Sequence, residues 1–125
     1  MQTGQEPSTQ SQAVRRFTDP AYIEVAPHLG ALRQKIDALD AQIVELLAQR
    51  ALCVRDATRF KRDAFQVAAP ARQAQVFERV RSMAHQHAEK FPGFADIVES
   101  AYRSLVAGFI AAEQDLFKAT EEIPS

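Results

Sequence analysis

The chain has 125 residues, of which 46% are hydrophobic and 25% are charged, and its formal net charge is −1. This length suits a single domain, and the balance of residue types excludes wholesale disorder. A net charge so close to zero gives no electrostatic basis for binding nucleic acid or an anionic membrane, so the basic residues matter for their placement. The single cysteine, Cys53, lies among apolar residues and is more typical of packing than of catalysis.

The first 28 residues are predicted to form a flexible tail. Residues 2–12 are rich in Gln, Ser and Thr, and residues 14–26 contain an Asp-Pro pair. No apolar run approaches the roughly 20 residues that cross a bilayer, and the start of the chain lacks the apolar core of a signal peptide. We therefore expect a cytoplasmic protein whose folded part spans residues 29–120, with a short tail at 121–125.

A long helix is predicted from Leu29 to about Ala64, because apolar residues recur there at helical spacing. At about 100° per residue they lie within roughly 60° of one line along the helix. The residues of this apolar stripe are Leu32, Ile36, Leu39, Ile43, Leu46, Leu47, Val54 and Ala57. A rod of about 36 residues, roughly 54 Å long, cannot be covered by its own short chain. This length indicates an intertwined oligomer, most simply a twofold dimer.

Two cations, Arg50 and Lys61, lie on the same stripe, whereas the other basic residues of this helix point to its flank or to solvent. A cation in the middle of an apolar face has lost much of its water and needs a compensating anion. No acid lies on the stripe, so the anion comes from elsewhere in the fold or from a ligand. Arg33 is about 100° around the helix from Arg50 and roughly 26 Å along its axis, so an antiparallel partner chain would most naturally deliver it to the same site.

Two further helices complete the predicted fold. Residues 66–69 are expected to form a loop, after which Pro70 suits the first turn of a second helix that ends near residue 89. Proline and glycine interrupt the chain within residues 90–93. A third helix at 94–118 has two apolar sides and should be central. No strand alternation is present, so the predicted fold is all-α, with three helices per chain, one very long, in an intertwined homodimer.

Several segments together resemble the all-helical class of chorismate mutases. They are Leu32 to Asp40, Arg50, Lys61, Pro70-Ala71-Arg72 and Ala112-Glu113-Gln114. The stretches Arg59-Phe60-Lys61 and Ala69-Pro70-Ala71-Arg72 are more similar to the branch that contains isochorismate-pyruvate lyases. The resemblance covers residues 29–118, and its specific part is the joint spacing of Arg33, Arg50, Lys61, Arg72 and Gln114.

The resemblance implies a homodimer with two equivalent sites, each completed by Arg33 from the other chain. The implied substrate is chorismate, a small dicarboxylate, and Arg33 and Arg50 would each bind a carboxylate through paired guanidinium donors. Lys61 and Gln114 would be the catalytic residues, donating to the ether oxygen as its bond to carbon breaks. The rearrangement to prephenate requires no base, nucleophile, metal or cofactor, only a held conformer and preorganised donors.

Arg72 and Gln73 complete the implied substrate-binding set, and departures from the family pattern leave the substrate open. Gln73 stands where many of these mutases have an acid that contacts the ring hydroxyl, Ala69 where aspartate is common, and Ile110 where serine is common. Chorismate, isochorismate and an amino analogue are therefore alternatives, and the second would eliminate pyruvate to leave salicylate. We rank the mutase first and the lyase second.

Structural interpretations compete with each candidate residue. Arg50 alone is better explained by bonds to helix carbonyls or to an acid of another helix, and it is Lys61 and Arg72 together with it that favour a site. Lys61 alone is explained equally well by its place near a helix end. His85 and His87 are two residues apart and do not chelate one metal as an i, i+4 pair would. A non-catalytic helical dimerisation module would explain the long stripe, but it does not explain the inward-facing cations.

Overall fold

The computed structural model describes residues 4–124, so residues 1–3 and 125, which belong to the two predicted tails, lie outside the description. The described chain is helical and contains no strand, which confirms the predicted all-α class. It divides into two compact units, residues 1–48 and residues 49–125. The boundary falls within the long helix α1.

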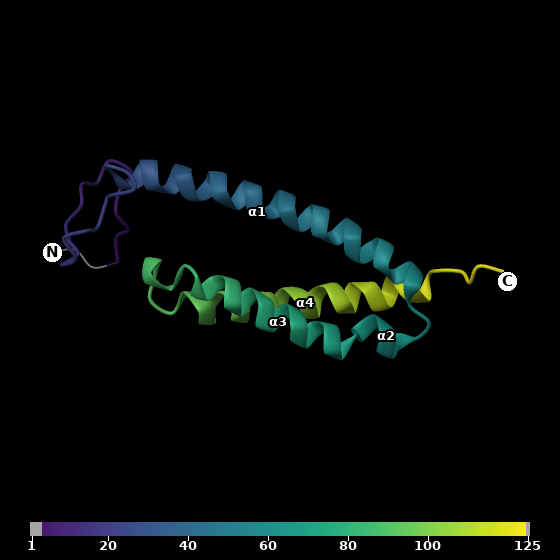
Figure 1. Cartoon of the computed structure of the whole chain (residues 1–125). Helices are drawn as coiled ribbons and strands as arrows, with labels where there is room; N and C mark the ends of the chain where they lie inside the picture. Colours follow the sequence, from purple (N-terminus) through teal and green to yellow (C-terminus); the bar gives the residue numbers. More distant parts are fainter. Residues whose placement is uncertain (1–3, 125) are drawn as a thin grey trace. The chain divides into compact units, whose positions relative to one another are not determined.

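The first unit contains the N-terminal segment and most of α1, which spans Leu29–Ala57 (Figure 1). The helix begins at the predicted residue, where Nδ1 of His28 accepts a hydrogen bond from the backbone N–H of Ala31 at 3.3 Å. Residues 4–28 form turns and bends without a helix. The Gly30 N–H donates to the Thr9 carbonyl at 2.9 Å, and a Cβ at Gly30 would lie 2.9 Å from that oxygen, so glycine permits this close approach.

The apolar stripe of α1 is exposed. No residue of this helix is buried, and four stripe residues, Ile36, Leu39, Ile43 and Leu46, each have more than half of their surface in contact with solvent. A long helix whose apolar line faces water is typical of a helix that pairs with another chain. The homodimer remains a prediction, and this exposed line supports it.

The long helix ends earlier than predicted. A 3-10 helix, η1, follows α1 at Thr58–Phe60, and Lys61 has an extended backbone with φ −102° and ψ 139°. Asp63 then starts a new helix, α2, at Ala64–Ala68, because its side chain accepts a hydrogen bond from the Gln66 N–H at 2.8 Å. The predicted helix through residue 64 and the predicted loop at 66–69 are therefore wrong, since an aspartate N-cap restarts the helix.

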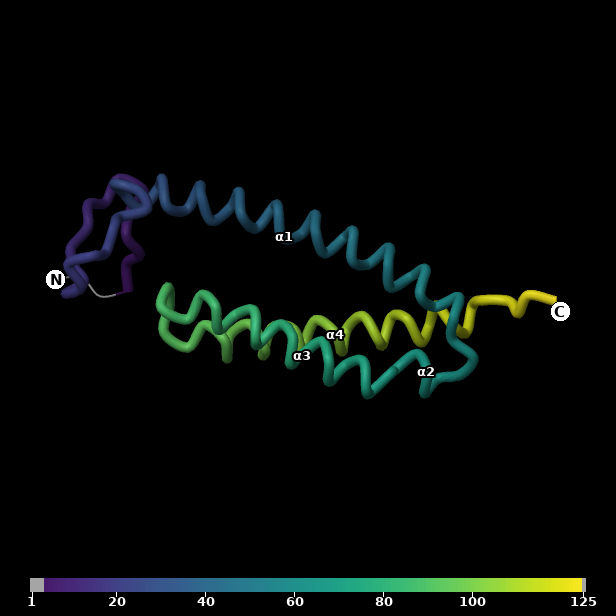
Figure 2. Tube along the Cα trace, viewed as in Figure 1, coloured from purple at the N-terminus to yellow at the C-terminus, as the bar shows by residue number. Residues whose placement is uncertain are grey.

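The second unit is built on α3, Pro70–His85, and α4, Phe94–Lys118, which run antiparallel and side by side (Figure 2). The predicted start of α3 and both predicted ends of α4 are confirmed. The end predicted near residue 89 is wrong: α3 stops at His85, the Gln86 N–H donates to the Met83 carbonyl in a tighter turn, and a 3-10 helix, η2, follows at Ala88–Lys90. The buried apolar residues are Val67, Val80, Ala84, Ala95 and Val106.

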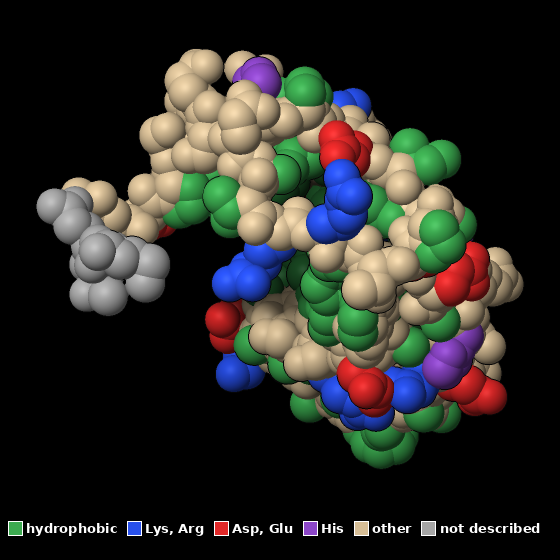
Figure 3. Space-filling view, turned by 90° about the vertical axis from the view of Figure 1, so that its left-hand side faces the viewer, with side chains coloured by type: hydrophobic (Ala, Val, Ile, Leu, Met, Phe, Trp, Pro, Cys, Tyr) green, Lys and Arg blue, Asp and Glu red, His purple; other side chains and the backbone are tan. Residues whose placement is uncertain are grey.

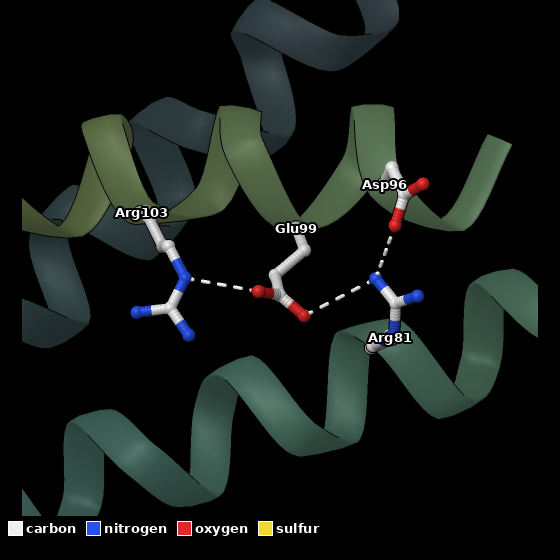
Figure 4. Close-up of polar contacts among 4 residues, drawn as sticks. All are labelled: Arg81, Asp96, Glu99 and Arg103. Carbon is white, nitrogen blue, oxygen red and sulfur yellow. Dashed lines mark hydrogen bonds and ion pairs between the residues drawn. The ribbon is translucent and has the colours of Figure 1, made fainter. Parts of the chain in front are cut away.

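An ion-pair network joins α3 to α4 (Figure 4). Arg81 on α3 donates to Asp96 at 2.7 Å and to Glu99 at 3.4 Å, and Arg103 donates to Glu99 at 3.0 Å. The Arg103 guanidinium also lies 4.4 Å from the ring centroid of Phe77. The hydrogen bond from Arg103 lowers the pKa of Glu99, and the hydrogen bond to Asp96 raises the pKa of Arg81. The network therefore favours the charged forms of Glu99 and Arg81.

We expect Glu99→Gln to lower stability more at about pH 7 than at about pH 3. Because the pKa of Glu99 is lower in the folded than in the unfolded chain, its contribution is full above the ordinary value of about 4.3 and is lost as the pH falls through the folded value. Urea midpoints at the two pH values measure this change, with the exposed Glu89→Gln as the matched control. Identical midpoints for Glu99→Gln and the native chain near neutral pH would contradict the expectation.

Charges of both signs share the surface with exposed apolar residues. Figure 3 shows one face on which Lys, Arg, Asp and Glu side chains lie close together among hydrophobic ones. This mixing agrees with the net charge of −1 and differs from the continuous basic patch of a nucleic-acid-binding face. Among the helices of the described part of the chain, none is both long and apolar enough to cross a membrane.

Candidate functional site

A pocket of about 310 Å³ lies in the second unit, where the end of α1 meets α2, α3 and α4. This volume falls in the range of small-molecule sites. Most of its wall is apolar, and the two aliphatic residues Val67 and Val106 are buried. The ionisable side chains that line it, apart from the thiol of Cys53, are Arg50, Lys61, Arg72 and Glu113. Three cations and one acid thus surround a space of ligand size.

Arg50 lies on the last part of α1 and is half-buried. Its guanidinium stacks over the ring of Phe109 on α4, 5.1 Å from the ring centroid. This cation–π contact steadies the guanidinium, whose paired N–H donors match a carboxylate. None of the ion pairs among the described residues involves Arg50, Lys61 or Arg72. No acid of the described fold therefore forms an ion pair with these cations, although Glu113 lines the same pocket.

Lys61 reaches the pocket from a different backbone than predicted. It follows η1 with an extended backbone, so it does not share a helical line with Arg50, yet both side chains line the same pocket. The Lys61 Nζ donates to the carbonyl of Gln66 at 3.0 Å. Lys61 thus enters the pocket from extended backbone instead of from a helix, and it still lies in the same pocket as Arg50.

Arg72 and Gln73 occupy the first turn of α3, and both line the pocket. Arg72 is exposed, and Gln73 donates from Nε2 to the carbonyl of Ala68 at 2.7 Å. This bond satisfies one carbonyl at the end of α2, a position that helices leave without an internal partner. Gln73 therefore holds the α2–α3 junction as well as facing the pocket.

Gln114 does not line the pocket. Its Nε2 donates to the carbonyl of Ala64 at 2.9 Å, so the side chain is directed at α2. The residues of α4 that line the pocket are Val106, Phe109, Ile110 and Glu113, and Gln114, four residues after Ile110, lies at the edge of this face. Arg33 belongs to the first unit and is exposed. The structure thus brings Arg50, Lys61, Arg72 and Gln73 together around one pocket, and it does not bring Gln114 or Arg33 into its lining.

Glu113 was not among the residues predicted for the site. It is only 7% exposed, and Thr58, whose hydroxyl donates to Glu113 Oε2 at 3.3 Å, is 3% exposed. The sequence did contain a signal, because Glu113 continues the i, i+3, i+4 and i+7 face that starts at Val106. An acid on an apolar helix face points to a buried role in the same way as a cation on an apolar stripe.

Ala69 gives the pocket wall a strained backbone. Its φ of 45° and ψ of 62° are left-handed, and it is the one residue other than glycine with positive φ in the described part of the chain. Such a conformation costs an L-residue roughly 1–2 kcal/mol. The strained position joins α2 to α3 and sets the direction in which α3 carries Arg72 and Gln73.

We expect Ala69→Gly to raise the free energy of unfolding by up to about 1 kcal/mol, because glycine adopts left-handed backbone without strain. The matched control is Ala68→Gly, the same change one residue earlier inside α2. It should lower stability by about 0.5–1 kcal/mol, since glycine in a helix costs conformational entropy. Urea denaturation measures both, and an equal loss of stability in the two variants would show that the Ala69 backbone is not strained.

A family model for chorismate mutase type II matches residues 32–114. The match covers well over half of the chain and includes every residue that lines the pocket. No curated protein matched the chain. With its helical fold and its cation-lined pocket inside the matched range, the chain belongs to the chorismate mutase type II family.

Proposed function

We propose that this protein is a chorismate mutase that rearranges chorismate to prephenate in the pocket of the second unit. The observation that carries the proposal is the convergence of Arg50, Lys61 and Arg72 on one small pocket without an ion-pair partner among the described residues. Half-burying Arg50 and Lys61 without an ion-pair partner is unfavourable, and a dicarboxylate supplies the missing charge. The family membership supports the same substrate class.

The two arginines in the pocket are suited to different parts of a dicarboxylate. Arg50 is held by a cation–π contact with Phe109 and offers a pair of donors, which matches one carboxylate in a bidentate arrangement. Arg72 is exposed at the start of α3 and has freedom to follow the second carboxylate or to screen it from solvent. Holding both ends of the substrate fixes the conformer in which the bond-forming carbon atoms meet.

Lys61 is the proposed donor to the ether oxygen. Its Nζ is preorganised by the Gln66 carbonyl, and an ammonium has three protons, so it can bind that carbonyl and the ligand together. As the carbon–oxygen bond breaks, negative charge grows on the oxygen, and the fixed cation stabilises the transition state more than the substrate. Gln114 would join Lys61 only by exchanging its bond to the Ala64 carbonyl for one to the ligand.

We further propose a homodimer in which Arg33 completes the site of the other chain. The support is the exposed apolar line of α1, on which Ile36, Leu39 and Ile43 are each more than half exposed. Pairing this line with a second copy would remove a large apolar area from water. The same pairing would add one more arginine to a site that has to neutralise a dianion.

Elimination of pyruvate from isochorismate is the second candidate. The observation that favours it is the neutral Gln73, which is bonded to the Ala68 carbonyl and places no charge near a ring hydroxyl. The same cations would stabilise the leaving oxygen of that reaction, in which a ring hydrogen moves to the departing pyruvate and salicylate remains. The two reactions thus need the same pocket, and their substrates differ in the position of one hydroxyl.

Product identification by proton NMR separates these functions. The native protein is incubated with chorismate and, separately, with isochorismate, and each product is assigned from its spectrum. Prephenate from chorismate supports the mutase. Salicylate and pyruvate from isochorismate, with chorismate unchanged beyond its spontaneous rate, would replace the mutase by the lyase. No product from either compound would contradict both proposals and favour the dimerisation module.

A further inference from the structure

Glu113 is the one acid in a pocket lined by three cations, and few hydrogen-bond donors of the described chain contact its carboxylate. Its only recorded hydrogen bond within the described chain comes from Thr58, whose Oγ1 also lies 3.1 Å from the Val54 carbonyl. A hydroxyl has one proton, so Thr58 divides it between these two acceptors. A carboxylate has about four acceptor positions, so Glu113 retains acceptor capacity in a place that is only 7% exposed.

Glu113 lines the pocket, and only one of its two carboxylate oxygens has a hydrogen-bond partner among the described residues. Oε2 takes the Thr58 hydroxyl at 3.3 Å, and the residue as a whole lines the pocket next to the face of α4 that carries Phe109 and Ile110. None of the described ion pairs involves Glu113, so the three pocket cations do not satisfy it. No buried side-chain oxygen of the described chain lacks a partner, so the second oxygen of Glu113, Oε1, which has no hydrogen bond, is accessible and can accept one from a ligand.

We propose that Glu113 determines specificity by accepting a hydrogen bond from a hydroxyl on the ring of the bound dicarboxylate. This inference rests on the proposed function and adds a recognition residue to it. The donor is a hydroxyl rather than an ammonium because three cations line the same pocket, and a positive group on the ligand would meet their repulsion. Glu113 thereby supplies, from α4, the acidic contact that the neutral Gln73 cannot make from α3.

Glu113 also has a structural contact, so the test must separate the two roles. Through Thr58 it ties the start of η1 to α4, and η1 leads directly to Lys61. A merely structural Glu113 would therefore change turnover of every substrate to the same extent. If Glu113 contacts the hydroxyl, its replacement changes the ratio of kcat/KM between a substrate that has this hydroxyl and one that lacks the hydroxyl proton.

The experiment compares kcat/KM for chorismate and for its 4-O-methyl ether, which retains both carboxylates and lacks the hydroxyl proton. The native protein should prefer chorismate by at least about tenfold, the value of a hydrogen bond to a charged group. In Glu113→Gln, which has the same size and no charge, this ratio should fall severalfold. Thr58→Val removes the structural contact and should lower stability while the ratio stays at the native value.

Each outcome decides between the alternatives. An unchanged ratio in Glu113→Gln, with both rates reduced equally, would overturn the specificity role and leave a positioning role through Thr58. If Glu113→Gln does not fold, the native protein alone still tests the inference, since equal kcat/KM values for the two compounds would overturn it. Absence of chorismate turnover in the native protein would instead reject the proposed function and this inference with it.

Discussion

Replacing Lys61 with methionine is expected to reduce kcat for chorismate by about 100- to 1000-fold, the usual effect of removing one preorganised donor from a developing oxyanion. The fold should survive the change. The lost hydrogen bond from Nζ to the Gln66 carbonyl costs about 1 kcal/mol, and removal of a half-buried cation without an ion-pair partner acts in the opposite direction. The free energy of unfolding should therefore stay within about 1 kcal/mol of the native value.

Arg62→Met is the matched control for Lys61→Met. Arg62 is the next residue, carries the same charge and is exposed, and its side chain does not line the pocket. Its replacement should leave kcat within about twofold of native, because a surface charge outside the site contributes little to catalysis. Turnover in Lys61→Met equal to that in Arg62→Met would show that Lys61 does not act on the ether oxygen.

Mixing two inactive variants should restore activity if the site is shared between chains. Arg33→Ala and Lys61→Ala are each expected to be nearly inactive as pure proteins. After random exchange, half of the dimers are mixed, and in each of these one of the two sites has all its native residues, so about one quarter of the native rate should return. The effect is large because it appears against a background close to zero.

The control mixture contains Arg50→Ala and Lys61→Ala. Both residues line the same pocket of one chain, so every site in the mixed dimer lacks one of them and no activity should return. Chain exchange is verified by mass spectrometry of differently tagged chains. Exchange without recovery in the Arg33→Ala mixture would show that Arg33 is not delivered across an interface.

The helices were predictable where a local signal fixes the backbone. Pro70 marks the first turn of α3, and the Pro92-Gly93 break precedes α4, whose ends were both predicted correctly. The end of α1 was not, because the apolar period continues across Thr58–Phe60 although the backbone changes to a 3-10 helix. Periodicity reports which face is apolar, and it does not report a short capped restart such as the one at Asp63.

The pocket cations were predictable because a charge on an apolar line is unusual and needs a reason. Arg50 and Lys61 were identified in that way, although Lys61 arrives on an extended backbone. The family resemblance directed attention to Gln114, which is adjacent to Glu113, one of the residues of α4 that line the pocket. Which of two adjacent polar residues faces a cavity depends on how α4 rotates against α2 and α3, and that rotation is decided by packing between helices rather than by either residue alone.

The most direct test of the claim that these cations serve a dianion is a calorimetric titration with prephenate, the product dicarboxylate. The native protein should bind it, and Arg50→Met should bind it at least about tenfold more weakly, since hydrogen bonds to a charged group contribute about 1.5–3 kcal/mol. Arg55→Met, an exposed cation on the same helix outside the pocket, is the control and should bind like the native protein. A dissociation constant unchanged by Arg50→Met would contradict the claim.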